Sequence, residues 1–141
     1  MLNNQNYEKM KNLLVVLTFI IGGMSFGQQS VSFQATKYTT DIDSDEYTET
    51  NEVYTFSFKD KMLCHNVYSG DEISDAQFYK IISVKDVELD AGDAWTIQAE
   101  SGVSGSVYTY VLVSLDAGGY ILVQGDYWYM GNVVNCKTFK Q

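Results

Sequence analysis

The chain has 141 residues, one histidine, two cysteines, no proline and a formal net charge of −9. All its basic residues are lysines, so it lacks the guanidinium group that binds phosphate and carboxylate through paired hydrogen bonds. Binding to nucleic acid or to an anionic membrane surface depends on basic side chains that neutralise phosphates. The composition therefore excludes nucleic acid as an expected partner and disfavours nucleotides and other phosphorylated ligands.

Residues 1–27 have the order of a cleaved secretory signal peptide. Lys9 and Lys11 precede the apolar run Leu13–Ile21, and Ser25 and Gly27 then supply small residues. The alternative is a membrane anchor, but a helix needs about 20 apolar residues to cross a bilayer and this run is shorter. We expect cleavage after Gly27.

Cleavage there leaves residues 28–141 as one β-domain, which is exported to the periplasm or secreted and has no membrane span. Translation can begin at Met1 or at Met10, which makes residues 1–9 an N-terminal extension of the signal. Seven lysines against seventeen Asp and Glu give the exported part a charge of about −10. A domain of this length buries roughly two-thirds of its unfolded surface, which suffices for one core.

The two cysteines, Cys64 and Cys136, both lie in the exported part. Export places them in an oxidising compartment, where a pair is expected to form a disulfide. The bond would close a loop of 72 residues, for which chain entropy gives a stabilisation of about 4 kcal/mol. The alternative is two thiols that pack as small apolar groups.

No stretch shows a helical period, whereas β-rich runs that alternate between apolar and polar residues recur between turns. The expected strands are Val31–Tyr38, Thr48–Phe58, Met62–Tyr68, Phe78–Val84, Trp95–Glu100, Ser106–Leu115, Tyr120–Gln124, and one strand or a pair over Tyr127–Phe139. The turn at residues 59–61 predicts a hairpin between the second and third of these.

These eight or nine strands predict an all-β fold. Short connections favour an antiparallel meander in which sequential strands are neighbours. The segment Val107–Leu115 is apolar on both faces, so part of the sheet is covered twice or curls over itself. A closed, barrel-like arrangement of the lipocalin-like plan meets both conditions and leaves no free edge. A two-layer sandwich is the alternative.

The run Tyr127–Gly131 and the terminal residues 137–141, together with the meander, resemble small uncharacterised exported β-proteins of Gram-negative bacteria. This resemblance covers the tail and the overall plan, and it implies no particular activity. Lipocalins share the plan but usually carry a Gly-x-Trp near the first strand, whereas the first tryptophan here is Trp95. Membership of the lipocalins is therefore not inferred.

An acidic segment between the first two expected strands has the ligand spacing of an EF-hand-type calcium loop. Its first, third, fifth, ninth and twelfth places hold Asp41, Asp43, Asp45, Glu49 and Glu52. Glu46 stands where such a loop has glycine, and the flanking sequence alternates like strands rather than helices. The alternative is a solvated acidic hairpin loop. Calcium is the one cofactor that the sequence suggests.

His65 is the single histidine, and it has no set of partners for a zinc site. It shares a strand face with Leu63 and Val67, so we expect a structural histidine. The sequence contains no Gly-x-Ser-x-Gly elbow, and its many acids single out no carboxylate pair. We name no catalytic residue and do not expect an enzyme.

Aromatic residues give the remaining functional signal. Tyrosine and tryptophan combine apolar area with a polar group and are enriched in binding sites, although strands also favour them for packing. The candidate ligand-binding residues are Tyr108, Tyr110, Tyr127, Trp128 and Tyr129. We predict an exported, non-catalytic domain that binds a small-molecule or glycan ligand in an aromatic-lined pocket or face. The alternatives are a module that binds a protein partner or has a structural role in the envelope, and a calcium-binding domain.

Overall fold

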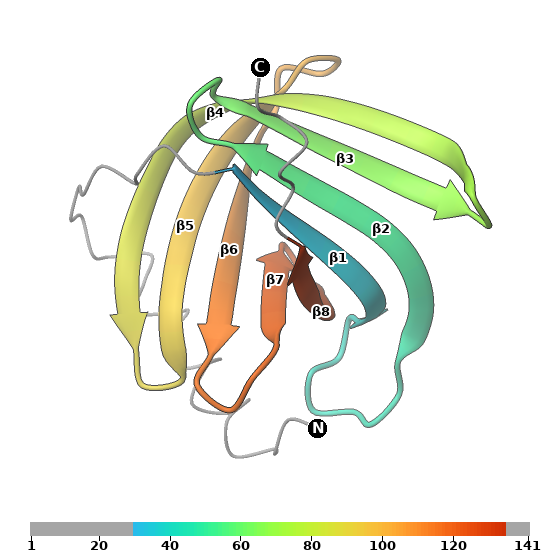
Figure 1. Ribbon diagram of the computed structural model, residues 1–141, viewed down its shortest axis with the longest axis vertical. Helices are drawn as coiled ribbons and strands as arrows, with labels where there is room; N and C mark the ends of the chain where they lie inside the picture. The colour runs from blue at the N-terminus through green and yellow to red at the C-terminus, as the bar shows by residue number, and fades with distance from the viewer. Residues whose placement is uncertain (1–29, 135–141) are drawn as a thin grey trace.

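The computed structural model describes residues 30–134, which form eight β-strands and no helix. Each strand pairs antiparallel with the next, and the last pairs with the first to close a barrel (Figure 1). The strands are β1 Ser30–Thr39, β2 Thr48–Ser57, β3 Met62–Ser69, β4 Glu72–Leu89, β5 Gly92–Ser101, β6 Val107–Leu115, β7 Tyr120–Gln124 and β8 Tyr127–Val134. The expected all-β meander is confirmed, and the barrel is confirmed over the sandwich.

β4 is the element that the sequence predicted least well. It begins at Glu72 rather than Phe78 and has 18 residues. Its first part and the adjoining end of β3 project beyond the rest of the wall (Figure 1), and residues 71–78 are all exposed. Because this projecting arm has solvent on both sides, its residues show no apolar alternation for a pattern to detect.

The barrel interior is filled by apolar side chains from all eight strands. Phe33, Phe56, Leu63, Ile97 and Leu112 are completely buried. A bulge in β1 between Ala35 and Lys37 shifts the alternation, so that Tyr38 lies opposite Tyr129 with its ring on the inner side. This shift adds one more aromatic ring to the interior near the end of β1.

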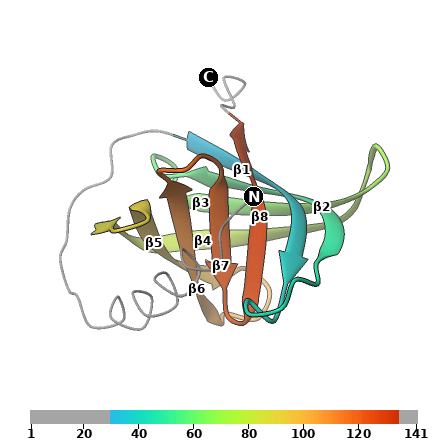
Figure 2. The ribbon, with the colours of Figure 1, turned by 90° about the horizontal axis from the view of Figure 1, so that it is seen from below.

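A second apolar cluster lies on the outward-facing positions of β5–β8, which stand side by side across the front of Figure 2. Val113 of β6 lies opposite Ala94 of β5 and Ile121 of β7. Leu112, the residue before Val113, belongs to the interior cluster and faces inward. β6 is therefore apolar on both faces, as the sequence predicted, because its wall separates two hydrophobic clusters.

Among the described residues, no helix is long or apolar enough to span a membrane. The signal peptide predicted over residues 1–27 and the tail after Val134 lie outside the described residues, and so does Cys136. Cys64 is half-buried, and its thiol donates a hydrogen bond of 3.5 Å to Asn66 Oδ1. The Cys64–Cys136 disulfide therefore stays a prediction.

The register limits how that disulfide could form. Val134 lies opposite Ser32, Ser32 opposite Thr55, and Thr55 opposite Cys64. Three strand spacings, or about 14 Å, therefore separate Val134 from Cys64. The predicted disulfide would have to bridge this separation.

Closure of the barrel depends on a glycine at the seam between β1 and β8. A Cβ atom on Gly131 would lie 1.8 Å from the carbonyl oxygen of Gln34 and 3.0 Å from the Cα of Ala35. Since both contacts are with backbone, no side-chain movement could relieve them. We predict that Gly131→Ala lowers the free energy of unfolding by about 3 kcal/mol or more, measured by urea denaturation.

Gly125→Ala is the matched control, because a Cβ there meets nothing within 4 Å. Its φ of +58° should cost about 1 kcal/mol. Equal losses in the two variants would show that the close approach at the seam does not govern closure.

Candidate functional site

A polar, aromatic cavity lies toward one end of the barrel, inside the wall. Its volume is about 200 Å³, and it is lined by Tyr54, His65, Gln77, Tyr79, Tyr108, Tyr110, Gln124 and Tyr129. Gln124 adjoins the β7–β8 turn and Tyr108 lies near the start of β6. The cavity therefore lies toward the end that carries the β1–β2, β3–β4, β5–β6 and β7–β8 loops, here called the mouth.

Strand pairing brings one row of the lining together. Tyr54 on β2 lies opposite His65 on β3, which lies opposite Gln77 on β4. Directly opposed residues on neighbouring strands share a face and have side chains about 5 Å apart. Tyr54 and the completely buried Phe56 are two residues apart on β2, so they share the inward face. The whole row therefore faces inward.

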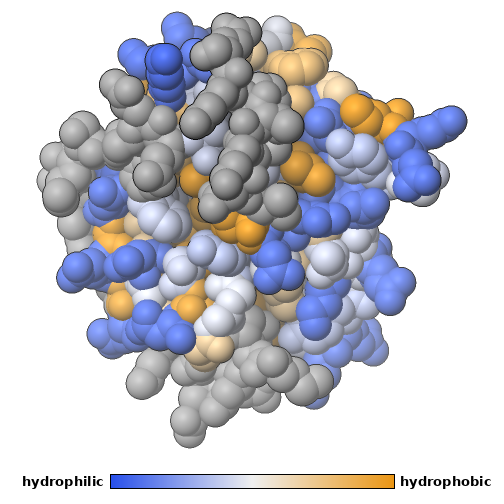
Figure 3. Space-filling view, viewed as in Figure 1, coloured by the Kyte–Doolittle hydropathy of each residue, from blue (hydrophilic) through white to orange (hydrophobic). Residues whose placement is uncertain are grey.

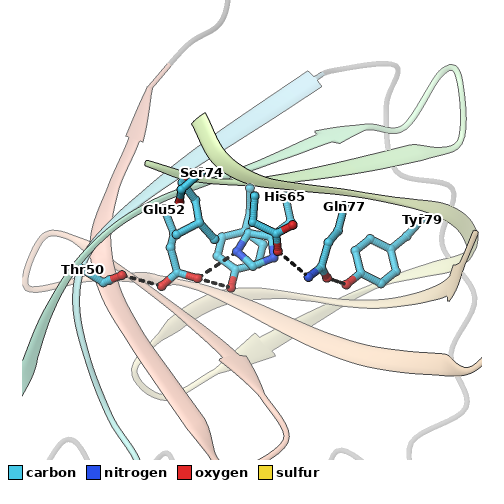
Figure 4. Close-up of polar contacts among 9 residues, drawn as sticks. Thr50, Glu52, His65, Ser74, Gln77 and Tyr79 are labelled. Atoms are coloured by element: carbon cyan, nitrogen blue, oxygen red, sulfur yellow. Dashed lines mark hydrogen bonds and ion pairs between the residues drawn. The ribbon is translucent and has the colours of Figure 1, made fainter. Parts of the chain in front are cut away.

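The imidazole of His65 is held on two sides. Its Nε2 lies 2.8 Å from Glu52 Oε1, and its ring stacks on Tyr54 with centroids 4.0 Å apart and an interplanar angle of 9° (Figure 4). Glu52 also accepts hydrogen bonds from Thr50 Oγ1 at 2.7 Å and from the Tyr54 hydroxyl at 3.4 Å. A carboxylate that is only 7% exposed is therefore fully partnered.

Burial and hydrogen bonding act in opposite directions on Glu52. Burial raises the pKa of a carboxyl group, but the hydrogen bonds from His65 and Thr50, with the charge of His65, outweigh it and lower the pKa of Glu52. Glu52 is thus ionised at neutral pH. Because an ionised carboxylate only accepts hydrogen bonds, His65 Nε2 is the donor in this pair.

A second hydrogen-bonded chain lies on the other side of His65 (Figure 4). The Tyr79 hydroxyl donates to Gln77 Oε1, and Gln77 Nε2 donates to Asp75 Oδ2 at 2.8 Å. A further hydrogen bond links Tyr110 to Tyr79. Both chains therefore end on a carboxylate, Glu52 in one and Asp75 in the other.

The tyrosines act as neutral groups. Burial is the main cause that raises the pKa of Tyr54 and Tyr110 far above the usual value, and it also raises the pKa of Tyr79 and Tyr129. Their hydroxyls consequently remain protonated at any physiological pH. They offer hydrogen bonds and ring faces to the cavity, but no charge.

Aromatic surface continues from the cavity to the rim. The Tyr38 ring centroid lies 5.7 Å from that of Tyr127 and 5.7 Å from that of Tyr129, and Tyr127 stacks on Tyr129 at 6.0 Å. Tyr127 is 43% exposed. Beyond Tyr38, the β1–β2 loop encloses an open cleft of about 630 Å³ with acidic residues in its lining.

The five aromatic residues chosen from the sequence go to three places. Tyr108, Tyr110 and Tyr129 line the cavity, and Tyr127 stacks at the rim. Trp128 faces outward and packs against the outer apolar cluster, because successive strand residues point to opposite sides. The structure therefore does not bring Trp128 to the cavity.

Sequence reasoning missed Tyr54, Gln77, Tyr79 and Gln124, and it treated His65 as purely structural. A usable signal was present in the β2–β3 hairpin. Ser57 lies opposite Met62 next to the turn of this hairpin. Counting three residues away from the turn along each strand therefore sets Tyr54 opposite His65. The pairing with Glu52, by contrast, depends on side-chain reach between rows.

The calcium-loop residues are spread over different surroundings. Asp41 and Asp43 lie in the β1–β2 loop, where Asp43 N donates to Asp41 Oδ1 at 3.1 Å, and Asp45 lies in the same loop. Glu49 lies opposite Lys37, and Glu52 contacts His65 inside the barrel. Within residues 30–134 no group of three His, Cys, Asp or Glu is placed to hold a metal ion. Calcium binding stays a prediction.

Comparison with protein-family models, curated proteins and solved structures finds no match to this chain. The resemblance to exported β-proteins therefore stays a prediction, and function has to be argued from the site itself.

The Glu52–His65 pair makes stability depend on pH. Because the pKa of Glu52 is lowered from 4.5 in the folded protein, its stabilising effect is present above that value and is lost as pH falls through the folded pKa. We predict that Glu52→Gln lowers the free energy of unfolding by about 2 kcal/mol at neutral pH. The difference from the unmutated protein should shrink in acid, measured by urea denaturation between about pH 7 and pH 3.

Glu72→Gln provides the control for this comparison, since Glu72 is exposed at the β3–β4 turn. It should leave the unfolding curve almost unchanged at each pH. A Glu52→Gln effect of constant size from neutral to acid pH would contradict the assigned electrostatics.

Proposed function

We propose that this barrel binds a small polar ligand, about the size of one sugar ring, in the cavity at its mouth. The observation that carries the proposal is the convergence of five tyrosines, two glutamine side chains and His65 on one space of about 200 Å³. Tyrosine hydroxyls and glutamine amides form hydrogen bonds with polar ligands. A ligand with several hydroxyl or amino groups can bond to these side chains from within the cavity.

The packed interior argues against a long apolar ligand. Beyond the cavity, Phe33, Phe56, Leu63, Ile97 and Leu112 are completely buried in one cluster. An acyl chain would need a continuous space along the barrel axis, whereas these side chains fill it. The volume is also below the 300–1,000 Å³ of pockets for drug-sized ligands, which favours a single small ring.

The tyrosine rings suit a carbohydrate-like ligand in particular. A sugar ring has apolar C–H faces and a polar edge, and tyrosine offers an apolar face with a hydroxyl at its tip. Tyr54, Tyr79, Tyr110 and Tyr129 are each 8% exposed or less, so their positions are held by packing. Such preorganisation reduces the entropy lost when a ligand binds.

The alternative, a module that binds a protein partner, is favoured by exposed apolar side chains on the outer wall. Met62, Phe78, Ile82 and Val107 are each about half exposed. On the face seen in Figure 3, however, hydrophobic residues reach the surface in separate groups between hydrophilic ones. A docking surface is expected to be more continuous, so the cavity supports the ligand-binding proposal better.

The proposal predicts that one tyrosine hydroxyl contributes measurably to affinity. A panel of monosaccharides is titrated into the protein by calorimetry, and any binder is then tested against Tyr110→Phe, which removes a cavity hydroxyl and keeps the ring. We expect about tenfold weaker binding, the effect of one lost hydrogen bond.

Tyr120→Phe is the matched control, because Tyr120 packs against the same interior cluster but does not line the cavity. It should bind like the unmutated protein. If no monosaccharide binds, or if the two variants lose affinity equally, the proposed function is wrong.

A further inference from the structure

Two chains of hydrogen bonds lead from the cavity lining to carboxylates. His65 Nε2 and the Tyr54 hydroxyl both donate to Glu52, and Thr50 donates to the same carboxylate. On the opposite side, Tyr79 donates to Gln77, which donates to Asp75. Each chain of hydrogen bonds thus ends on a carboxylate (Figure 4).

Two of the lining tyrosines consequently present acceptors to a ligand. The hydroxyl protons of Tyr54 and Tyr79 are engaged with Glu52 and Gln77, so their oxygens present lone pairs. A ligand that carries hydrogen-bond donors can use these acceptors.

Two carboxylates lie close to the lining. Among the described residues that line the cavity there is no lysine, while Glu52 and Asp75 lie directly behind the lining. The faces of aromatic rings are the negative end of their quadrupole and attract cations. The cleft beside Tyr38 adds Asp41, Asp45 and Glu46.

We propose that the natural ligand is a cation, a small polar ring that carries a protonated amino group, of the amino-sugar class. This inference rests on the proposed function and names its ligand chemistry. An ammonium group supplies three hydrogen-bond donors and a positive charge, which match the acceptors and the carboxylates. A carboxylate-bearing sugar would place negative charge beside Glu52 and Asp75, so we expect it to bind most weakly.

The test uses sugars that differ only in charge. Glucosamine, glucose and glucuronate, and the corresponding galactosamine, galactose and galacturonate, are titrated by calorimetry at about pH 6.5, where the amino group is protonated. Within each series we expect the amino sugar to bind about tenfold or more tightly than the neutral sugar, and the acid to bind most weakly.

Two variants then assign the preference to the carboxylates. Glu52→Gln and Asp75→Asn each remove one charge at the end of a chain, and each should reduce the preference for the amino sugar over the neutral sugar. Asp75 is exposed on the β3–β4 arm, so its variant tests the inference without disturbing the core. Glu72→Gln, on the same arm, should leave the preference unchanged.

The outcomes separate this inference from the proposed function. If acids or neutral sugars bind as tightly as the amino sugars, the cationic ligand class is wrong although the cavity binds sugars. A preference that survives both carboxylate variants also overturns it. If no member of either series binds, the proposed function itself fails.

Discussion

The pairing of β1 with β8 is the constraint on which the rest of the structure depends. It turns an eight-strand meander into a closed barrel in which neither terminal strand has an unpaired edge. The approach is close enough that Gly131 has no room for a side chain beside Gln34. The bulge between Ala35 and Lys37 in β1 shifts the register of this seam and brings Tyr38 inward. One local irregularity at the seam therefore helps to form the aromatic rim.

Closure creates an interior with two different parts. Away from the mouth the interior is filled by completely buried apolar residues such as Phe56 and Leu112. Toward the mouth the same alternation of inward positions carries tyrosines, Gln124 and His65 instead. Polar groups buried in this way are costly unless hydrogen-bonded, and the chains that end on Glu52 and Asp75 meet that requirement. The same chains place two carboxylates close to the lining of the cavity.

The strands and their meander order were predictable because alternation and short turns are local properties, and the sequence favoured a barrel while leaving a sandwich as the alternative. The run Val107–Leu115 even indicated two covered faces, and the structure has an apolar cluster on each side of β6. The first part of β4 was not predictable, because residues 71–78 project into solvent and carry no alternation. Of the candidate site, Tyr108, Tyr110 and Tyr129 were found from aromatic content. His65 was recognised but assigned a structural role, since its partners Glu52 and Tyr54 lie on another strand.

By itself the sequence determined that the chain is an all-β meander of short antiparallel strands, strongly acidic and free of arginine. These properties follow from residue type and from periodicity over a few neighbours. Only the tertiary structure decided which inward residues share one cavity, because that depends on the register of six strands at once. It also decided that Glu52 belongs with His65 rather than with Asp41 and Asp43. A carboxylate's partner is set by the distance between its atoms and a donor, and strand pairing brings residues distant in sequence within that distance.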